Sequence, residues 1–184
     1  MEQHDVALIV GSNRRESINA QLARALVALA PAHLRFVPVQ IDDLPMYNPD
    51  RDPEGEAAVR RLKTDVGRCS GLLVVTPEHN RSIPAVLKNA IDWGSKPMPA
   101  SVWRDKAVAI AGTSPGAIGT AVGQQHLRQI LGVLGGLVLG GEAYVQCKPG
   151  FFDASGGITD ESTEAFLQAY MERFGDLVRK MARN

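Results

Sequence analysis

The fold is decided by the stretch VALIVGSNRRESINAQLARALVAL, residues 6–29. Residues 6–10 form an apolar run without alternation, which is typical of a strand buried on both faces. The run stops at Gly11, small polar and basic residues follow, and residues 18–29 then place apolar side chains at helical spacing. A buried strand, a polar loop and an amphipathic helix in this order indicate an α/β protein. They also raise the question whether the loop only turns the chain or holds an anion.

The same alternation of strand and helix continues along the chain. Apolar runs predict further strands at 34–39, 71–75, 107–111 and 136–140, and helical patterns predict helices at 54–68, 84–93, 119–134 and 159–182. The strand at 34–39 contains Pro38, which cannot donate to a ladder, so we expect it at an edge of the sheet. We therefore predict one flavodoxin-like domain over residues 1–184, a three-layer α/β sandwich around a five-stranded parallel sheet in the order 2-1-3-4-5. The polar connection 42–53 is expected to be an exposed flap.

The composition argues against several classes of protein. The 184 residues carry 20 Lys plus Arg and 20 Asp plus Glu, so no net charge attracts nucleic acid. We expect no membrane partner, because no apolar run reaches the length of a membrane span, and the N-terminal residues do not resemble a signal peptide. Two distant cysteines and four histidines lack metal-ligand spacing, so we expect free thiols, a cytoplasmic location and no metal site. We expect the serines to act as caps rather than as hydrolase nucleophiles.

Three loops of unusual composition follow the first, third and fourth predicted strands. They are loop 1 (11–17), loop 3 (76–82) and loop 4 (112–119), and they share the sheet edge where open α/β sheets bind ligands. In loop 1, Gly11 permits a sharp turn, Ser17 suits a helix N-cap, and Arg14 offers a bidentate phosphate contact at a helix start. Neither G-x-G-x-x-G nor a P-loop motif is present, which disfavours a dinucleotide fold or an NTPase. The alternative for loop 1 is a solvated, capped turn.

Loops 3 and 4 suit the edge of a flat ligand. In loop 3, Ser82 is a cap candidate for the next helix, and backbone groups around residues 77–80 are placed to face a heterocycle. Glu78 and His79 form a possible acid–base pair, but adjacent side chains usually diverge, so we favour a wall over a catalytic pair. The small side chains of loop 4 leave its backbone open to close approach, although an ordinary glycine-rich turn has the same composition.

Together, GSNRRESIN (11–19) and TPEHNRSIPAVLKNAIDWGS (76–95) resemble the NADPH-dependent FMN reductase family, including its quinone and chromate reductases. A weaker match at QQHLRQILGVLGG (124–136) extends the resemblance, which covers about residues 6–134. The family pattern has a tyrosine at the position of His79 and a glycine at the position of Ala85. The first difference bears on stacking against the ring, and the second leaves the helix intact.

The resemblance implies a non-covalently bound FMN, NADPH or NADH as reductant, and a small electron acceptor such as a quinone or free flavin. It implies a ping-pong cycle in which reductant and acceptor use the same open ring face in turn, and it requires no catalytic side chain. The residues that match the family's cofactor-binding positions are Ser12, Arg14, Ser17 and Asn19 for the phosphate, with Ile18 in the same turn; Pro77, Glu78, His79 and Asn80 for the ring; and Ser114, Gly116 and Gly119 in loop 4.

Two other functions and an oligomer are also considered. A flavodoxin-type electron carrier without reductase activity is disfavoured, because the chain is neutral and loops 3 and 4 lack Trp and Tyr. A regulatory domain without a flavin remains possible on the same scaffold. The resemblance implies a homodimer or homotetramer through residues 84–103, with four large side chains expected to be exposed, unless they pack within the monomer: Trp93, Met98, Val102 and Trp103.

Overall fold

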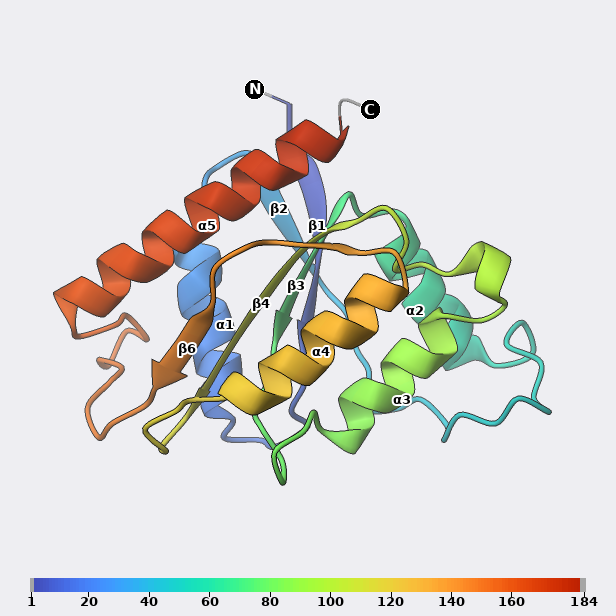
Figure 1. Cartoon of the computed structure of the whole chain (residues 1–184), viewed down its shortest axis with the longest axis horizontal. Coiled ribbons are helices and arrows are strands. Elements are labelled where there is room, and N and C mark those ends of the chain that lie inside the picture. Colours follow the sequence, from blue (N-terminus) through green and yellow to red (C-terminus); the bar gives the residue numbers. More distant parts are fainter. Residues whose placement is uncertain (1, 183–184) are drawn as a thin grey trace.

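The computed structural model describes residues 2–182 as a parallel sheet between two layers of helices (Figure 1). The strands are β1 (His4–Val10), β2 (Leu34–Pro38), β3 (Gly71–Val75), β4 (Ala107–Ser114), β5 (Leu137–Val138) and β6 (Ala143–Gln146). Their order is β2-β1-β3-β4-β5, and β6 pairs with β4 further along that strand. This order confirms the predicted flavodoxin-like fold, and β2 with its Pro38 is an edge strand as expected.

The helices divide between the two faces of the sheet. They are α1 (Ile18–Leu29), α2 (Ala57–Gly67), α3 (Ala85–Gly94), α4 (Ala121–Val133) and α5 (Glu161–Ala182), with a short 3-10 helix at Met98–Ala100. Leu72 and Val74 pack in one core cluster with α2, α3 and α4, whereas Leu73 and Val75 pack in the other with α1 and α5. Alternate residues of β3 thus face opposite helix layers, which is why the strand reads as a continuous apolar run.

The predicted fifth strand is wrong in its bounds. Only Leu137–Val138 of residues 136–140 forms a strand, and a separate strand follows at Ala143–Gln146. The connection between them bends at Gly141, whose φ is +81°. Arg128 of α4 holds this bend, because its guanidinium donates to the carbonyl oxygens of Leu139 (2.8 Å) and Gly141 (2.5 Å). Four residues ending in a glutamine give too weak a pattern to predict β6.

The prediction of exposed tryptophans is also wrong. Trp93 and Trp103 are fully buried. The Trp103 Nε1 donates to the Ile91 carbonyl oxygen at 2.9 Å, and a Cβ on Gly94 would lie only 2.4 Å from the Trp103 ring. The segment after α3 therefore folds back onto that helix, with Gly94 leaving room for the indole. Met98 does remain exposed, at 44%.

The carboxyl ends of the strands meet at one edge of the sheet, at the bottom of Figure 1. Loops 1, 3 and 4 all lie at this edge, whereas the start of β1 and the end of α5 lie at the opposite one. The fold therefore brings together the three loops that the sequence singled out. No helix within residues 2–182 is both long and apolar enough to cross a membrane.

Candidate functional site

Loop 1 continues β1 into a tight turn and then caps α1. The Gly11 N–H donates to the Val75 carbonyl oxygen (2.8 Å), and a Cβ on Gly11 would lie 2.5 Å from the Thr76 Oγ1, so only glycine fits. Ser17 is the N-cap of α1, and its Oγ accepts from the Ala20 N–H at 3.2 Å, which confirms the predicted cap. The helix start thus faces the sheet edge with its first amides free of intrahelical partners.

The arginines of loop 1 are available to a ligand. Arg14 and Arg15 are exposed, and neither takes part in a salt bridge within residues 2–182. The Arg14 backbone N–H lies 3.4 Å from the Ser12 Oγ, which makes the loop compact. Two free guanidiniums, a hydroxyl and a helix N-terminus form a donor set that suits a dianionic phosphate.

Asn19 ties loop 1 to loop 4. It is 2% exposed, its Nδ2 donates to the Thr113 carbonyl oxygen (2.9 Å), and its Oδ1 accepts from the Thr113 N–H (2.9 Å). Both polar groups of the side chain are therefore engaged by the backbone of β4. Asn19 was predicted as a phosphate ligand, but its side chain is taken up by Thr113. A phosphate contact through its backbone N–H stays a prediction.

Loop 3 is a tight two-residue turn. His79 and Ser82 exchange two backbone hydrogen bonds of 2.9 Å, and the residues between them, Asn80 and Arg81, have φ values of 51° and 65°. Positive φ at both central positions is typical of a type I′ turn and costs energy for a non-glycine residue such as Arg81. The predicted cap role of Ser82 is wrong, since the N-cap of α3 is Pro84, and the Ser82 Oγ lies 3.1 Å from the His126 Nδ1.

Glu78 fixes loop 3 to α4. Its side chain is only 8% exposed, its Oε2 accepts from the Gly123 N–H (2.9 Å), and its Oε1 accepts from Arg81 (3.1 Å). The carboxylate thus accepts from an amide in the first turn of α4, where free amides and the helix dipole favour a negative charge. Its polar atoms are engaged within the protein, so an acid–base role with the exposed His79 is not supported.

Loop 4 presents backbone and small side chains to solvent. Residues 115–118 are exposed, and a Cβ on Gly116 would meet only the Ser114 Oγ, at 3.5 Å. Residues 112–116 also match the G-x-S-x-G spacing of a hydrolase nucleophile. The Ser114 Oγ, however, donates to the Gly119 carbonyl oxygen (2.7 Å) and accepts from the Gly116 N–H (3.2 Å), so this hydroxyl holds the loop.

The three loops are locked against one another where the strands end. A Cβ on Gly112 would lie 2.2 Å from both the Thr76 carbonyl oxygen and the Thr120 Oγ1. Gly112 and Thr113 lie in the predicted loop 4 but were not among the predicted site residues, and Gly123 lies outside the three loops. Gly112 follows the apolar run of β4 directly, and a glycine at that position was the available signal of close packing.

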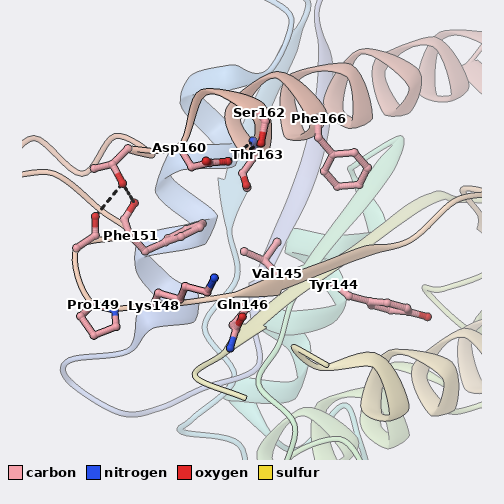
Figure 2. A pocket seen from close by; sticks show the side chains of 12 residues that line it. Tyr144, Val145, Gln146, Lys148, Pro149, Phe151, Asp160, Ser162, Thr163 and Phe166 are labelled. Atoms are coloured by element: carbon pink, nitrogen blue, oxygen red, sulfur yellow. Dashed lines mark hydrogen bonds between the residues drawn. The ribbon is translucent and has the colours of Figure 1, made fainter. Parts of the chain in front are cut away.

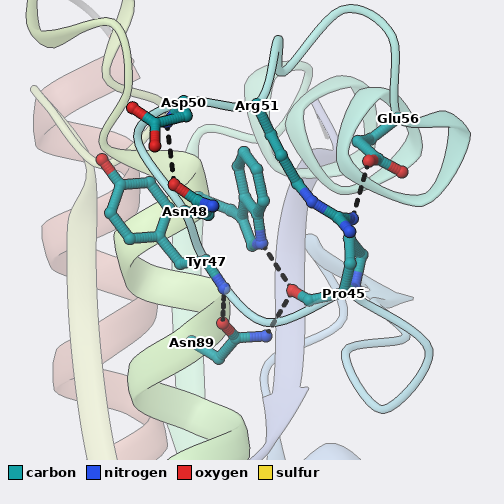
Figure 3. Close-up of polar contacts among 8 residues, drawn as sticks. Pro45, Tyr47, Asn48, Asp50, Arg51, Glu56 and Asn89 are labelled. Atoms are coloured by element: carbon teal, nitrogen blue, oxygen red, sulfur yellow. Dashed lines mark hydrogen bonds and ion pairs between the residues drawn. The ribbon is translucent and has the colours of Figure 1, made fainter.

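Two cavities contain no residue of loops 1, 3 or 4, whereas a third, of about 490 Å³, includes Ser82 of loop 3. One, of about 550 Å³, lies between the end of β6 and the first turns of α5, where Phe151, Phe166 and Lys148 contribute to its wall (Figure 2). The other, of about 560 Å³, lies against the segment 47–54, most of which belongs to the connection 42–53 that was predicted to be an exposed flap. That segment is exposed in part, but Tyr47 is half-buried and its backbone is held by Asn89 of α3 (Figure 3).

Comparison with known proteins gives one sequence family and several close relatives. The sequence profile of the family described as "NADPH-dependent FMN reductase" matches residues 4–149. The chain is 45% identical over 175 residues to a 2-hydroxy-1,4-benzoquinone reductase of Burkholderia sp, which covers 95% of this chain and 96% of the relative. It is 43% identical over 178 residues to a quinone reductase of Pseudomonas putida, with 96% and 95% covered.

Solved structures agree with these relatives. FerB, a flavoenzyme NAD(P)H:(acceptor) oxidoreductase from Paracoccus denitrificans, superimposes with a TM-score of 0.92 at 40% identity, covering 97% of this chain and 98% of that one. A flavodoxin mutant from Pseudomonas aeruginosa superimposes with a TM-score of 0.59 at 20% identity, which shows a shared fold alone.

Proposed function

The chain belongs to the family of NADPH-dependent FMN reductases, and from that premise we propose that FMN binds across loops 1, 3 and 4. The protein is an FMN-dependent NAD(P)H oxidoreductase. Bound FMN supplies the electron transfer between NAD(P)H and the acceptor, while the chain binds the FMN, orients it and shields it. The observation that carries the proposal is the pair of exposed arginines in loop 1, between β1 and α1, which form no salt bridge within residues 2–182.

The phosphate belongs in loop 1. Arg14 supplies charge, the hydroxyls of Ser12 and Ser17 line the turn, and the amides of Ile18 and Asn19 lie in the first turn of the helix. No positively charged side chain besides those of loop 1 is needed, because a helix start already favours an anion.

The ring belongs between loops 3 and 4. Pro77, His79 and Asn80 form one wall, and Ser114 and Gly116 form the other, with Glu78 holding the first wall to α4. The turn at residues 80–81 fixes the backbone of His79, because His79 and Ser82 exchange two hydrogen bonds. We assign no catalytic side chain, since the polar groups of Glu78 and Ser114 serve the loops themselves.

The acceptor is proposed to be a quinone, a free flavin or a similar small molecule, because relatives at 43% and 45% identity are named as quinone and hydroxybenzoquinone reductases. We also propose a homodimer or homotetramer. Large apolar side chains are exposed at the end of α4 and nearby, as at Val133 (80%) and Leu137 (52%), and a second copy would cover them. Two free cysteines, Cys69 and Cys147, support a reducing, cytoplasmic location.

The test is spectroscopic and kinetic. Purified protein, with FMN added and excess removed, is expected to show absorbance bands at about 370 and 450 nm, because these belong to an oxidised flavin. It is then expected to oxidise NADPH or NADH with 1,4-benzoquinone, giving parallel lines in double-reciprocal plots. A protein that stays colourless contradicts the FMN site, and a coloured protein inactive with both reductants favours a carrier.

A further inference from the structure

The cavity beside segment 47–54 is lined by both apolar and charged side chains. Its volume is about 560 Å³, within the range of small-molecule pockets. It lies between that segment, α2, the end of α3 and the 3-10 helix. The apolar part of its wall is formed by Tyr47, Pro49, Pro53, Trp93, Pro97 and Ala100.

The aromatic part of this wall is held in place before any ligand arrives. The Asn89 Oδ1 accepts from the Tyr47 N–H (2.7 Å), and the Asn89 Nδ2 and the Trp93 Nε1 both donate to the Pro45 carbonyl oxygen, at 3.0 and 2.7 Å (Figure 3). The rings of Tyr47 and Trp93 stand edge to face, with centroids 5.1 Å apart and planes at 81°. A fixed aromatic wall lowers the ordering cost of binding a flat ring.

The charged part of the lining contains two ammonium groups, those of Lys63 and Lys96, and the carboxylates of Asp52 and Glu54. Lys63 of α2 is only 14% exposed, and its nearest carboxylate, that of Glu54, is 3.5 Å away and 69% exposed. Lys96 lines the same cavity and forms no salt bridge in the described part of the chain. Arg51, by contrast, is paired with Glu56 at 2.9 Å. A largely buried cation is stabilised most by a second anion when its own carboxylate partner is distant and exposed to solvent.

We propose that this cavity binds a planar aromatic anion of one or two rings. The ring lies against the wall that contains Tyr47 and Trp93, and the acidic group pairs with Lys63 and Lys96. Trp93 lies about 12 Å along α3 from Ala85, the first residue of that helix, by helical rise, so the site is separate from the predicted flavin loops. The proposal does not depend on the proposed function.

The test is a calorimetric titration with 2-naphthoate, using the neutral and nearly isosteric 2-naphthamide as the matched ligand. The protein is used as purified, with and without saturating FMN. We expect 2-naphthoate to bind at least tenfold more tightly than the amide, with the same affinity in both preparations. We expect Lys63→Met and Lys96→Met each to weaken naphthoate binding by about tenfold or more, the scale of a charged hydrogen bond.

Lys148→Met is the control variant, because Lys148 lines the other aromatic cavity shown in Figure 2. It is expected to leave naphthoate binding unchanged, and thermal melts establish that all three variants fold. Equal binding of the acid and the amide overturns the proposal. So does a loss of binding in Lys148→Met with none in Lys63→Met, and so does displacement of naphthoate by FMN.

Discussion

The side chain of Asn19 replaces a neighbouring strand for Thr113. Strand β3 leaves the sheet after Val75, and the N–H and carbonyl of Thr113, two residues past the last β3–β4 pair, are both taken up by the Asn19 amide at 2.9 Å. The carboxamide has the same donor and acceptor as a peptide group, so it continues the ladder by one position. The start of α1 and the end of β4 are thereby held at a fixed separation.

Replacing Asn19 by Ala is expected to weaken both the fold and FMN binding. Two fully buried backbone groups of Thr113 lose their partners, which is expected to lower the free energy of unfolding by about 1–3 kcal/mol. Urea unfolding of the FMN-free variant measures that loss, and flavin fluorescence titration measures the affinity. Asn13→Ala, at an exposed position of loop 1, is the control. An unchanged free energy of unfolding in Asn19→Ala would contradict the proposed role of Asn19 in holding the start of α1 to the end of β4.

Replacing Arg14 by Ala is expected to weaken FMN binding by about 1.5–3 kcal/mol, the scale of a hydrogen bond to a charged group. The fold is expected to be unaffected, because Arg14 is exposed and its side chain forms no salt bridge within residues 2–182. Titration of the FMN-free protein measures the loss. Arg24→Ala, on the exposed side of α1, provides the matched removal of a positive charge. If Arg14→Ala retains FMN normally, the assignment of the phosphate to loop 1 is contradicted.

Gly116→Ala is expected to separate flavin binding from folding. The added Cβ meets only the Ser114 Oγ at 3.5 Å, an ordinary contact, so the melting temperature should stay the same. FMN binding should weaken severalfold, because the methyl group stands where the ring approaches the loop backbone. Gly112→Ala is the opposite case: its Cβ would lie 2.2 Å from the Thr76 carbonyl oxygen, so it should unfold the protein. If Gly116→Ala binds FMN like the parent, loop 4 does not line the ring.

Local patterns were sufficient to predict most of the fold. The apolar runs of β1, β3 and β4 and the Ser17 cap each depend on residues close together in sequence, and all were confirmed. The strands at the far edge were harder, because β5 has two residues and β6 has a half-polar pattern. Their position depends on Arg128, a contact between segments that no local pattern encodes.

The supporting contacts of the site could not be predicted for the same reason. Asn19 and Thr113 are 94 positions apart, and Glu78 and Gly123 are 45 apart. A polar residue in a ligand-binding motif has two possible partners, a ligand or a distant backbone group, and sequence spacing does not distinguish them. The burial of Trp103 likewise depends on the missing side chain of Gly94, which is a signal only once the two segments are known to touch.

Glu78→Ala is expected to loosen the start of α4. The carboxylate is the acceptor for the Gly123 N–H and is shielded from solvent, so its loss should lower the free energy of unfolding by about 1–2 kcal/mol. Glu78→Gln keeps an acceptor oxygen and should lose less. Quinone reduction by FMN-loaded Glu78→Gln should remain within a few-fold of the parent, because the carboxylate has a capping role. A loss of several hundredfold at normal FMN affinity would identify Glu78 as an acid–base group instead.

Because of Asp160, the free energy of unfolding is expected to vary with pH in the acid range. Hydrogen bonds from Thr163 and Ser162 lower its pKa from 3.8 to about 2, so the folded state binds its proton less readily than the unfolded chain. Its contribution is therefore fully present above about pH 4 and is lost as the pH falls towards 2. Asp160→Asn keeps a capping oxygen but has no proton to bind, so its stability should fall less over that interval. Chemical unfolding of both proteins between pH 5 and 2, read by circular dichroism, measures the difference. Parallel curves for the two proteins would show that Asp160 has the same proton affinity in the folded and unfolded states.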